Sequence, residues 1–239
     1  MNYGSYKLLS VGNDAKTVKG EKKGYLTGIL YLAPHKLGGM GNVCPAATKG
    51  CIAACLNTAG RGAFQMVQDA RIRKTKLFFK DRTEFLEILQ KDIDTLVRHA
   101  RSNGMIPCVR LNGTSDLPWE KFGVMQWYGQ QVQFYDYTKI GLRMQSYLAG
   151  NMPSNYHLTF SRSGDNDELC KMILQKGGNV AAVFADKLPQ SWNGYEVING
   201  DESDLRFLDL KGTVVGLKTK GKGKVDSTGF VIRSGGSTP

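Results

Sequence analysis

Three cysteines crowded into one short segment are the most reactive feature of this sequence. Cys44, Cys51 and Cys55 all lie between Asn42 and Gly62, with six residues between the first two and three between the last two. Thiolates are ligands of zinc and of iron–sulfur clusters, so three in one loop indicate a metal or iron–sulfur site. The alternative is three buried cysteines that have no connection to one another.

A fourth ligand would distinguish the kinds of metal site. A structural zinc ion needs four protein ligands, and the loop has no second cysteine pair. His35 could complete a zinc site of three cysteines and one histidine, and Cys108 could also complete a set. A [4Fe-4S] cluster held by three thiolates instead leaves one iron open to a small ligand, and we favour this cluster. Cys170 lies on an apolar helical face and is expected in the core.

The stretches on either side of the cysteines should place them at the end of a strand. Residues 27–33 (TGILYLA) are β-branched and apolar and predict a strand that ends before Pro34. Over residues 63–102, apolar residues recur every three or four positions, which predicts one long helix or two. A break is expected at 81–83, with Thr83 as the N-cap.

Strand and helix patterns alternate along the rest of the chain. Such alternation implies parallel βαβ units with right-handed crossovers. About six units in a single domain, residues 1–239, predict an α/β fold that is a partial parallel βα barrel with the metal site at the carboxyl end of the strands. An open doubly wound sheet is the alternative. The next predicted strand begins at Pro107. Further strands are predicted at 132–137, 156–161, 180–185, 196–199 and 213–217, and helices at 119–128, 140–148 and 166–175.

Polar residues follow the predicted strands, at the mouth of such a barrel, where α/β barrels carry their active sites. Ser, Thr, Asn and Asp are also common helix N-caps, which is the simpler explanation for any one of them. Asp116, Lys139 and Arg162 are costly to hold unpaired in a pocket, so we expect them to contact a ligand or the cluster. The candidates are Asn112, Gly113, Thr114, Ser115, Asp116, Asp136, Tyr137, Thr138, Lys139, Ser161, Arg162, Ser163, Asp186, Lys187, Asn199, Asp201 and Asp204.

Length and composition are typical of one globular domain. A chain of 239 residues with 41% hydrophobic and 22% charged residues can bury a sizeable core. No apolar run approaches the roughly 20 residues of a membrane span, and the N-terminus lacks the apolar core of a secretory signal. Five cysteines, three of them in one loop, indicate a reduced compartment. We expect a soluble, cytoplasmic protein without a membrane partner, a basic extension at 1–24 and a flexible tail at 233–239.

The charge of the chain bears on its partners. A formal net charge of +11 favours polyanions, because clustered Lys and Arg release counterions from a phosphate backbone. The basic residues gather at 16–23, 71–80 and 218–224. Nucleic acid is therefore one expected partner, although the sequence has no recognisable nucleic-acid module. The alternative is a solvated basic surface.

A three-cysteine loop after the first strand of a partial βα barrel resembles the radical S-adenosylmethionine superfamily. In that superfamily three cysteines hold a [4Fe-4S] cluster, and the fourth iron chelates the methionine part of S-adenosylmethionine. The usual spacing there is three residues and then two, whereas this chain has six and then three. A glycine-rich motif with an acidic residue follows the second strand there and meets the amino group of the cofactor. LNGTSD, residues 111–116, stands in that place and resembles the motif loosely.

A second resemblance runs over most of the chain. Residues 8–37, CIAACLNTAGRG at 51–62 and RIRKTKLFF at 71–79 are similar to a family of bacteriophage proteins known as the gene-product-eighty-eight family. The cysteine loop is the most distinctive part of this similarity. The resemblance implies a viral protein that works in the cytoplasm of its bacterial host, and it implies no particular reaction.

Two hypotheses follow. The first is a radical-type iron–sulfur enzyme with an electron donor as partner, as the superfamily resemblance implies. The second is a structural or redox iron–sulfur cluster or zinc ion in a basic protein that binds nucleic acid or a phage partner without catalysis. In the first hypothesis, Cys44, Cys51 and Cys55 hold the cluster, Asn112, Gly113, Thr114, Ser115, Asp116, Ser161 and Arg162 bind S-adenosylmethionine, and Asp136, Tyr137 and Lys139 address the substrate.

Overall fold

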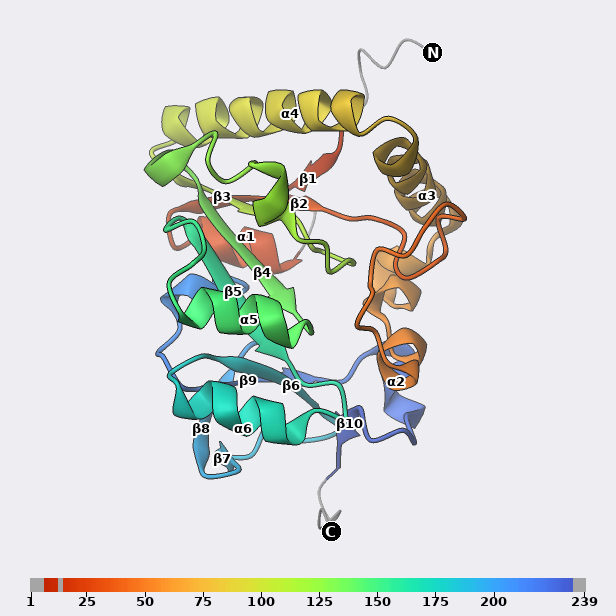
Figure 1. Cartoon of the computed structure of the whole chain (residues 1–239), viewed down its shortest axis with the longest axis vertical. Helices are drawn as coiled ribbons and strands as arrows, with labels where there is room; N and C mark the ends of the chain where they lie inside the picture. The colour runs from red at the N-terminus through yellow and green to blue at the C-terminus, as the bar shows by residue number, and fades with distance from the viewer. Residues whose placement is uncertain (1–6, 13–14, 234–239) are drawn as a thin grey trace.

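A computed structural model describes residues 7–12 and 15–233 of the chain (Figure 1). The predicted tail therefore lies outside the described residues, apart from Arg233. Ten strands form the sheet at the centre of the fold. The strands are β1 (Leu9–Val11), β2 (Tyr25–Leu30), β3 (Ile106–Arg110), β4 (Gln133–Thr138), β5 (Tyr156–Ser161), β6 (Val180–Phe184), β7 (Ser191–Trp192), β8 (Tyr195–Asn199), β9 (Val214–Lys218) and β10 (Val231–Ile232).

The order of the strands follows the chain across most of the sheet. Neighbours run β1, β2, β3, β4, β5, β6, β9, β8, β7, and β10 pairs with β6. The edge strands β1 and β7 pair antiparallel with their neighbours, and the other pairings are parallel. The predicted α/β class with a mostly parallel sheet is confirmed. The barrel is not confirmed, because the sheet is not closed.

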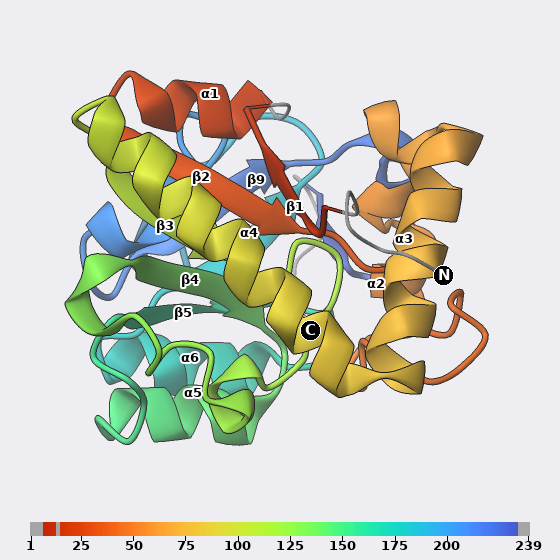
Figure 2. The ribbon, with the colours of Figure 1, turned by 90° about the horizontal axis from the view of Figure 1, so that it is seen from above.

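Helices α4, α5 and α6 cover one face of this sheet (Figure 2). α4 (Arg82–Ser102) packs on β2 and β3, α5 (Gly141–Leu148) on β4 and β5, and α6 (Asp167–Gln175) on β5 and β6. Right-handed crossovers between consecutive parallel strands put their helices on the same face. No helix in the described part of the chain is long and apolar enough to cross a membrane. The buried residues of α4 recur at helical spacing and are Phe85, Leu89, Ile93, Leu96, Val97 and Ala100.

The two faces of the sheet differ in chemistry, as β4 shows. Phe134 belongs to the apolar core beneath the helices. The alternate residues Tyr135 and Tyr137 point to the opposite face of the sheet, because side chains alternate along a strand. There the Tyr135 hydroxyl lies 3.4 Å from Asp204, and the Tyr137 ring centroid lies 4.7 Å from the guanidinium of Arg110. The face of the sheet opposite α4, α5 and α6 is therefore the polar one.

The N-terminal part differs from the predicted basic extension. Its described residues form β1 and α1 (Ala15–Glu21), and α1 packs against β2. Lys19 Nζ donates to the backbone oxygen of Asp201 at 3.0 Å, and Gly20 lies against Leu205. α1 therefore bridges β2 and the segment that follows β8, and it belongs to the folded domain.

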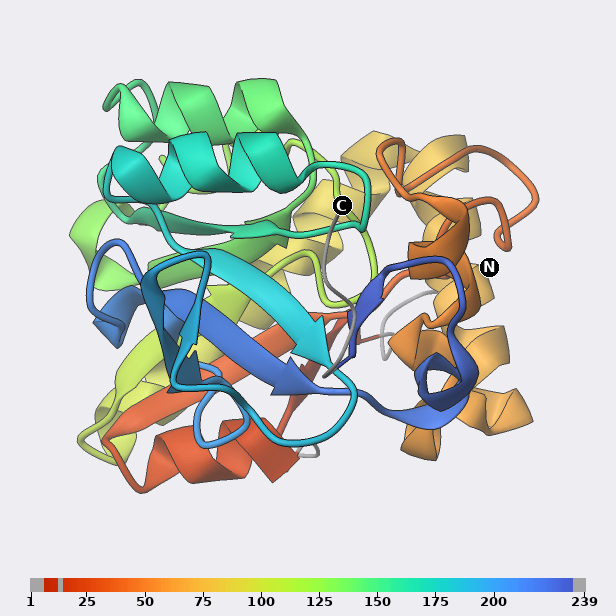
Figure 3. The same cartoon turned by 90° about the horizontal axis from the view of Figure 1, so that it is seen from below.

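The carboxyl ends of the strands point towards the side of the molecule that holds α2 (Lys49–Ala53) and α3 (Gln65–Lys80), as Figures 1 and 3 show. β10 also lies at this end. The first two residues of β6 pair with β5, whereas its last two pair with β10. β10 therefore pairs with the part of β6 that β5 does not reach, and it brings the C-terminal segment next to the cysteine loop.

Two helix predictions are corrected by the structure. Asp81 separates α3 from α4 and is the N-cap of α4 in place of Thr83, because its carboxylate accepts the backbone N–H of Glu84 at 2.9 Å. Residues 119–128 form a short 3₁₀ helix and turns, since Gly123 ends the helix in the left-handed region with φ of 74°. The 3₁₀ helices are Leu56–Thr58, Gly60–Ala63, Trp119–Phe122, Gly129–Gln131, Arg206–Leu208 and Gly221–Val225.

Candidate functional site

A cavity of about 240 Å³ lies between the cysteine loop and the carboxyl ends of the strands. All three cysteines of the loop line it, together with residues at or just beyond the ends of β3, β4, β5, β6 and β9. Asp136 is not among the described residues that line the cavity. The other predicted site residues that do line it are Asn112, Gly113, Thr114, Ser115, Asp116, Tyr137, Thr138, Lys139, Ser161, Arg162, Asp201 and Asp204.

Hydrogen bonds hold the cysteine loop to the ends of two strands. Cys44 Sγ donates to the backbone oxygen of Thr114 at 3.5 Å, beyond the end of β3. Thr48 is the N-cap of α2, and its hydroxyl accepts the backbone N–H of Cys51 at 3.2 Å. The same hydroxyl donates to the backbone oxygen of Ser163 at 3.2 Å, beyond the end of β5. The positions of Cys44 and Cys51 are therefore set by both strands.

The three thiols lie within electrostatic reach of one another. Burial, which the charges of Cys55 and Cys51 reinforce, raises the pKa of Cys44 to about 11. Burial also raises the pKa of Cys55, which the positive charges of Lys139 and Arg71 partly oppose. Cys44 and Cys55 are therefore neutral thiols near pH 7 unless a cation or a cluster binds and displaces their protons.

The proposed fourth ligands lie apart from the cavity lining. His35 meets Cys44 through its backbone, whose N–H donates to Sγ at 3.3 Å. Cys108 is buried in β3, and its Sγ lies 3.9 Å from the backbone oxygen of Ile106. Cys170 is buried on α6, as expected. Across residues 7–12 and 15–233, no three His, Cys, Asp or Glu side chains are grouped so that they could hold a metal ion.

The segment 112–116 packs directly against the cysteine loop. The backbone N–H of Gly113 donates to the carbonyl of Leu30 at 3.0 Å, and the N–H of Asp116 donates to that of Val43 at 2.8 Å. A Cβ on Gly113 would lie 2.7 Å from the Leu30 oxygen, so only glycine allows this approach. The structure thus brings together the two motifs that the sequence analysis singled out.

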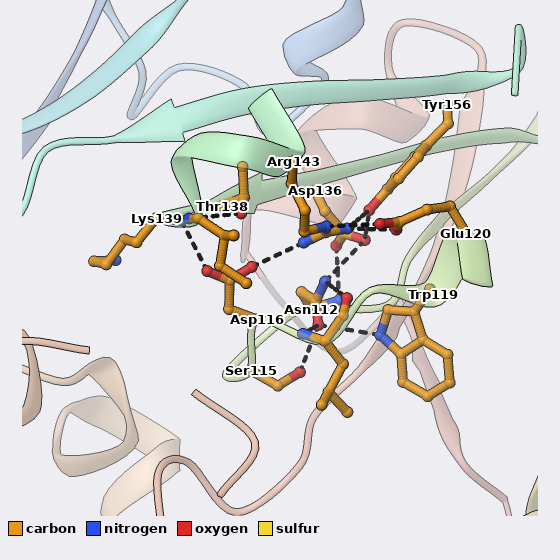
Figure 4. Close-up of polar contacts among 12 residues, drawn as sticks. Asn112, Ser115, Asp116, Trp119, Glu120, Asp136, Thr138, Lys139, Arg143 and Tyr156 are labelled. Carbon is orange, nitrogen blue, oxygen red and sulfur yellow. Dashed lines mark hydrogen bonds and ion pairs between the residues drawn. The ribbon is translucent and has the colours of Figure 1, made fainter. Parts of the chain in front are cut away.

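Asn112 and Asp136 form a buried hydrogen-bond network behind the cavity (Figure 4). The side-chain oxygen of Asn112 accepts from the Ser115 hydroxyl at 2.8 Å and from the Trp119 indole at 3.1 Å. Asp136 accepts the backbone N–H of Asn112 at 2.7 Å and the Tyr156 hydroxyl at 3.0 Å. Burial raises the pKa of Asp136 to about 7. Both side chains hold the turn at 112–116 in place.

Arg143 of α5 continues this network toward the cavity (Figure 4). Its guanidinium donates to Asp116 at 2.8 Å and makes two bonds to Glu120, at 2.7 and 2.9 Å. The other oxygen of Asp116 accepts the backbone N–H of Lys139 at 2.8 Å. Both carboxylate oxygens of Asp116 therefore have partners in the protein, and Asp116 joins the ends of β3 and β4.

Arg162 holds the C-terminal segment over the cavity. Its guanidinium makes two bonds to the Asp167 carboxylate, at 2.6 and 3.1 Å. Its remaining nitrogen donates to the backbone oxygens of Gly229 and Phe230 at 2.8 and 3.2 Å. Phe230 and Ser161 both line the cavity. The position of Arg162 is thus explained by its protein partners.

Arg110 is a cavity residue that the sequence analysis did not select. It stands at the end of β3, and its Nη1 donates to Asp204 at 2.9 Å. Its guanidinium lies over the Tyr137 ring, and its buried Nε has no hydrogen-bond partner among the described residues. The one signal in the sequence was a charged residue inside an otherwise apolar strand, which is expensive to bury without a partner.

Comparison with known proteins assigns a family to the chain. The model of a family described as Gene product 88 matches residues 7–234, which is nearly the whole sequence. No curated protein and no solved structure matches the chain. None of these comparisons supports the resemblance to the radical S-adenosylmethionine superfamily. The match over residues 7–234 shows that the chain belongs to the Gene product 88 family.

Proposed function

We propose that Cys44, Cys51 and Cys55 hold a [4Fe-4S] cluster that faces the cavity, and that the protein is a radical S-adenosylmethionine-like enzyme in the cytoplasm of a phage-infected bacterium. One observation carries the proposal. Three thiols from one loop line a single cavity at the carboxyl ends of the strands, and the described lining has no other cysteine and no histidine. A cluster with three protein ligands keeps one iron open to a small molecule.

The number of thiols supports a cluster over a structural zinc ion. A structural zinc ion needs four protein ligands, whereas a [4Fe-4S] cluster with an open iron needs three. The described cavity lining offers three thiols, which influence one another electrostatically. The backbone N–H of His35 also reaches Cys44, and hydrogen bonds to ligand sulfurs tune the potentials of such clusters.

The strand order supports the enzyme part of the proposal. β2, β3, β4, β5, β6, β9 and β8 are neighbouring parallel strands, one more than the six or so expected for a partial barrel of this kind. Their carboxyl ends meet at one rim, where α/β enzymes bind ligands. The cavity lies at that rim, next to the cysteines.

The residues free to meet a cofactor are fewer than the sequence analysis selected. A bound cluster and S-adenosylmethionine would supply one-electron chemistry. Asp116 and Arg162 already have partners in the protein, so they act mainly by positioning the loops. Gly113, Thr114, Ser115 and Ser161 line the cavity and would contact the cofactor. Lys139 is the lining residue best suited to contact the substrate.

Metal and sulfide analysis of anaerobically purified protein tests the cluster. We expect about four irons with sulfide per chain, and Cys51→Ala should lose both. Cys170→Ala is the matched control, because this buried cysteine does not line the cavity. Iron and sulfide that persist in Cys51→Ala would refute the cluster.

Electron paramagnetic resonance of the reduced protein tests the open iron. A spectrum that changes when S-adenosylmethionine is added would support the enzyme. An unchanged spectrum would favour a non-catalytic iron–sulfur protein. One zinc ion without sulfide would instead indicate a structural site in a basic protein that binds nucleic acid or a phage partner.

A further inference from the structure

We infer that this cavity binds a phosphate group of the substrate through Arg110 and Lys139, so that the substrate is a nucleotide, free or within a strand. The inference names a substrate class for the site proposed above and rests on that site being the reactive one. It follows from cationic donors in the cavity that lack protein acceptors, and from the basic segment at the cavity mouth.

Arg110 offers donors that the protein does not use. Its side chain is only 15% exposed, and Asp204 accepts from a single nitrogen of the guanidinium. The Nε atom is buried without a hydrogen-bond partner, a costly state for a charged donor. The Tyr137 ring, 4.7 Å away, stacks on the guanidinium and limits its orientation. A planar guanidinium with unused N–H donors at a cavity wall is suited to binding a phosphate group.

Lys139 adds a second cation to the same cavity. It follows β4, and its backbone N–H is held by Asp116 at 2.8 Å. No hydrogen bond or ion pair of its Nζ is found within the described chain. Its charge lowers the pKa of Cys55, so the ammonium lies within electrostatic reach of the cysteines. A phosphate bound to Lys139 would therefore place the substrate beside the cluster ligands.

The remaining charges of the cavity lining leave a positive excess. Five cations line it, and three carboxylates oppose them. The carboxylates of Asp204, Asp201 and Asp116 pair with Arg110, Lys220 and Arg143. Lys218, which also lines the cavity, has an exposed side chain at the end of β9. The lining cations are Arg110, Lys139, Arg162, Lys218 and Lys220.

The cavity mouth favours a phosphate chain over a small carboxylate. The 3₁₀ helix Gly221–Val225 carries Lys222 and Lys224, and it follows directly on Lys218 and Lys220. Lys222 also lines a groove shared with α2, beside the cysteine loop. Cations thus continue from the cavity onto the surface. Such a track attracts successive phosphates and makes binding dependent on salt.

Fluorescence anisotropy with a labelled single-stranded oligonucleotide tests the inference, with unlabelled nucleoside triphosphate and citrate as competitors. We expect saturable binding, and competition by the nucleotide that citrate does not match. Lys139→Gln should weaken binding about tenfold, since one charge-assisted contact is lost. Lys176→Gln makes the same charge change at the C-terminus of α6, away from the cavity, and should bind within about twofold of wild type.

Arg110→Lys should weaken binding by a similar factor, because lysine lacks the planar fork. If that variant fails to fold, Lys139→Gln decides alone, since no hydrogen bond or ion pair of the Lys139 side chain is found among the described residues. Absence of binding to either phosphate probe would overturn the inference. Binding that Lys139→Gln leaves unchanged, or that citrate abolishes as well as the nucleotide does, would also overturn it.

Iron and sulfide measured on the same preparations separate this inference from the proposed function. Phosphate binding without iron would support the phosphate site and refute the cluster. Iron and sulfide without phosphate binding would support the cluster and refute the phosphate site.

Discussion

Replacing Asp136 by Asn should change how the stability of the protein depends on pH. Asp136 is fully buried beside Asn112 and Tyr156 in the network of Figure 4. Burial raises its pKa from 3.8 to about 7, because the charged form is poorly solvated there. Asparagine keeps the shape of the side chain but cannot ionise.

The sign and size of the effect follow from linkage. Between pH 3.8 and about 7 the folded protein binds a proton at Asp136 that the unfolded chain has lost. The stabilisation is therefore fully present below pH 3.8 and is lost as pH rises through about 7. A shift of about three units corresponds to about 4 kcal/mol in all, of which about 2.5 kcal/mol falls between pH 5 and pH 8.

Guanidinium denaturation at pH 5, 6, 7 and 8 measures this effect. The free energy of unfolding of wild type, minus that of Asp136→Asn, should fall by about 2.5 kcal/mol across the series. His157 opposes the trend, because burial lowers its pKa to about 4 and its contribution to stability grows as pH rises toward 6.5. It is present in both proteins and cancels in the difference. Asp186→Asn, at an exposed carboxyl, is the control. Parallel curves for wild type and Asp136→Asn would refute the reasoning.

Two further substitutions test the packing around the cavity, with chemical denaturation as the measurement. Gly113→Ala should destabilise the protein by about 1–3 kcal/mol, since its Cβ would lie 2.7 Å from a carbonyl oxygen, whereas Gly20→Ala in α1 meets only ordinary contacts and should be neutral or slightly stabilising. Equal effects would contradict the close approach. Arg143→Ala should cost about 3–5 kcal/mol, because two buried carboxylates lose their partner, whereas Lys171→Ala removes an exposed ion pair and should stay within about 1 kcal/mol of wild type. If Arg143→Ala lowers the free energy of unfolding no more than Lys171→Ala does, water replaces the guanidinium and the reasoning is wrong.

Strands were the most predictable part of the fold. The strand predicted at 156–161 coincides with β5, because its apolar residues Tyr156, Leu158 and Phe160 alternate with polar ones at the period of a strand. Residues 119–128 have helix-like apolar spacing, but the chain folds there into a 3₁₀ helix and turns. Tertiary packing around Trp119 outweighs local helix preference at that point, and no pattern in a single sequence reports such packing.

The neighbourhood of the candidate site was predictable, but the orientation of its side chains was not. The carboxyl ends of parallel strands meet at one edge, so the cysteine loop and residues 112–116 had to lie near each other. Which face of β4 carries Asp136 depends on strand register, and a shift of one residue reverses it. Asp136 consequently lies behind the cavity, and Arg110 lies in it. Arg143, which pairs with Asp116, and Gly229, which accepts from Arg162, come from distant parts of the chain and have no local signal.

The contact between the cysteine loop and the C-terminal segment has a consequence for biosynthesis. Phe230, which lines the cavity, is made about 175 residues after Cys55. At about 5–20 residues per second, the ribosome takes roughly 10–35 s to cover that distance. During this interval the three cysteines have been synthesised while one wall of the cavity is still missing. For the cluster proposed above, the order of translation would leave an interval in which the cysteines are open on the side where Phe230 later lines the cavity.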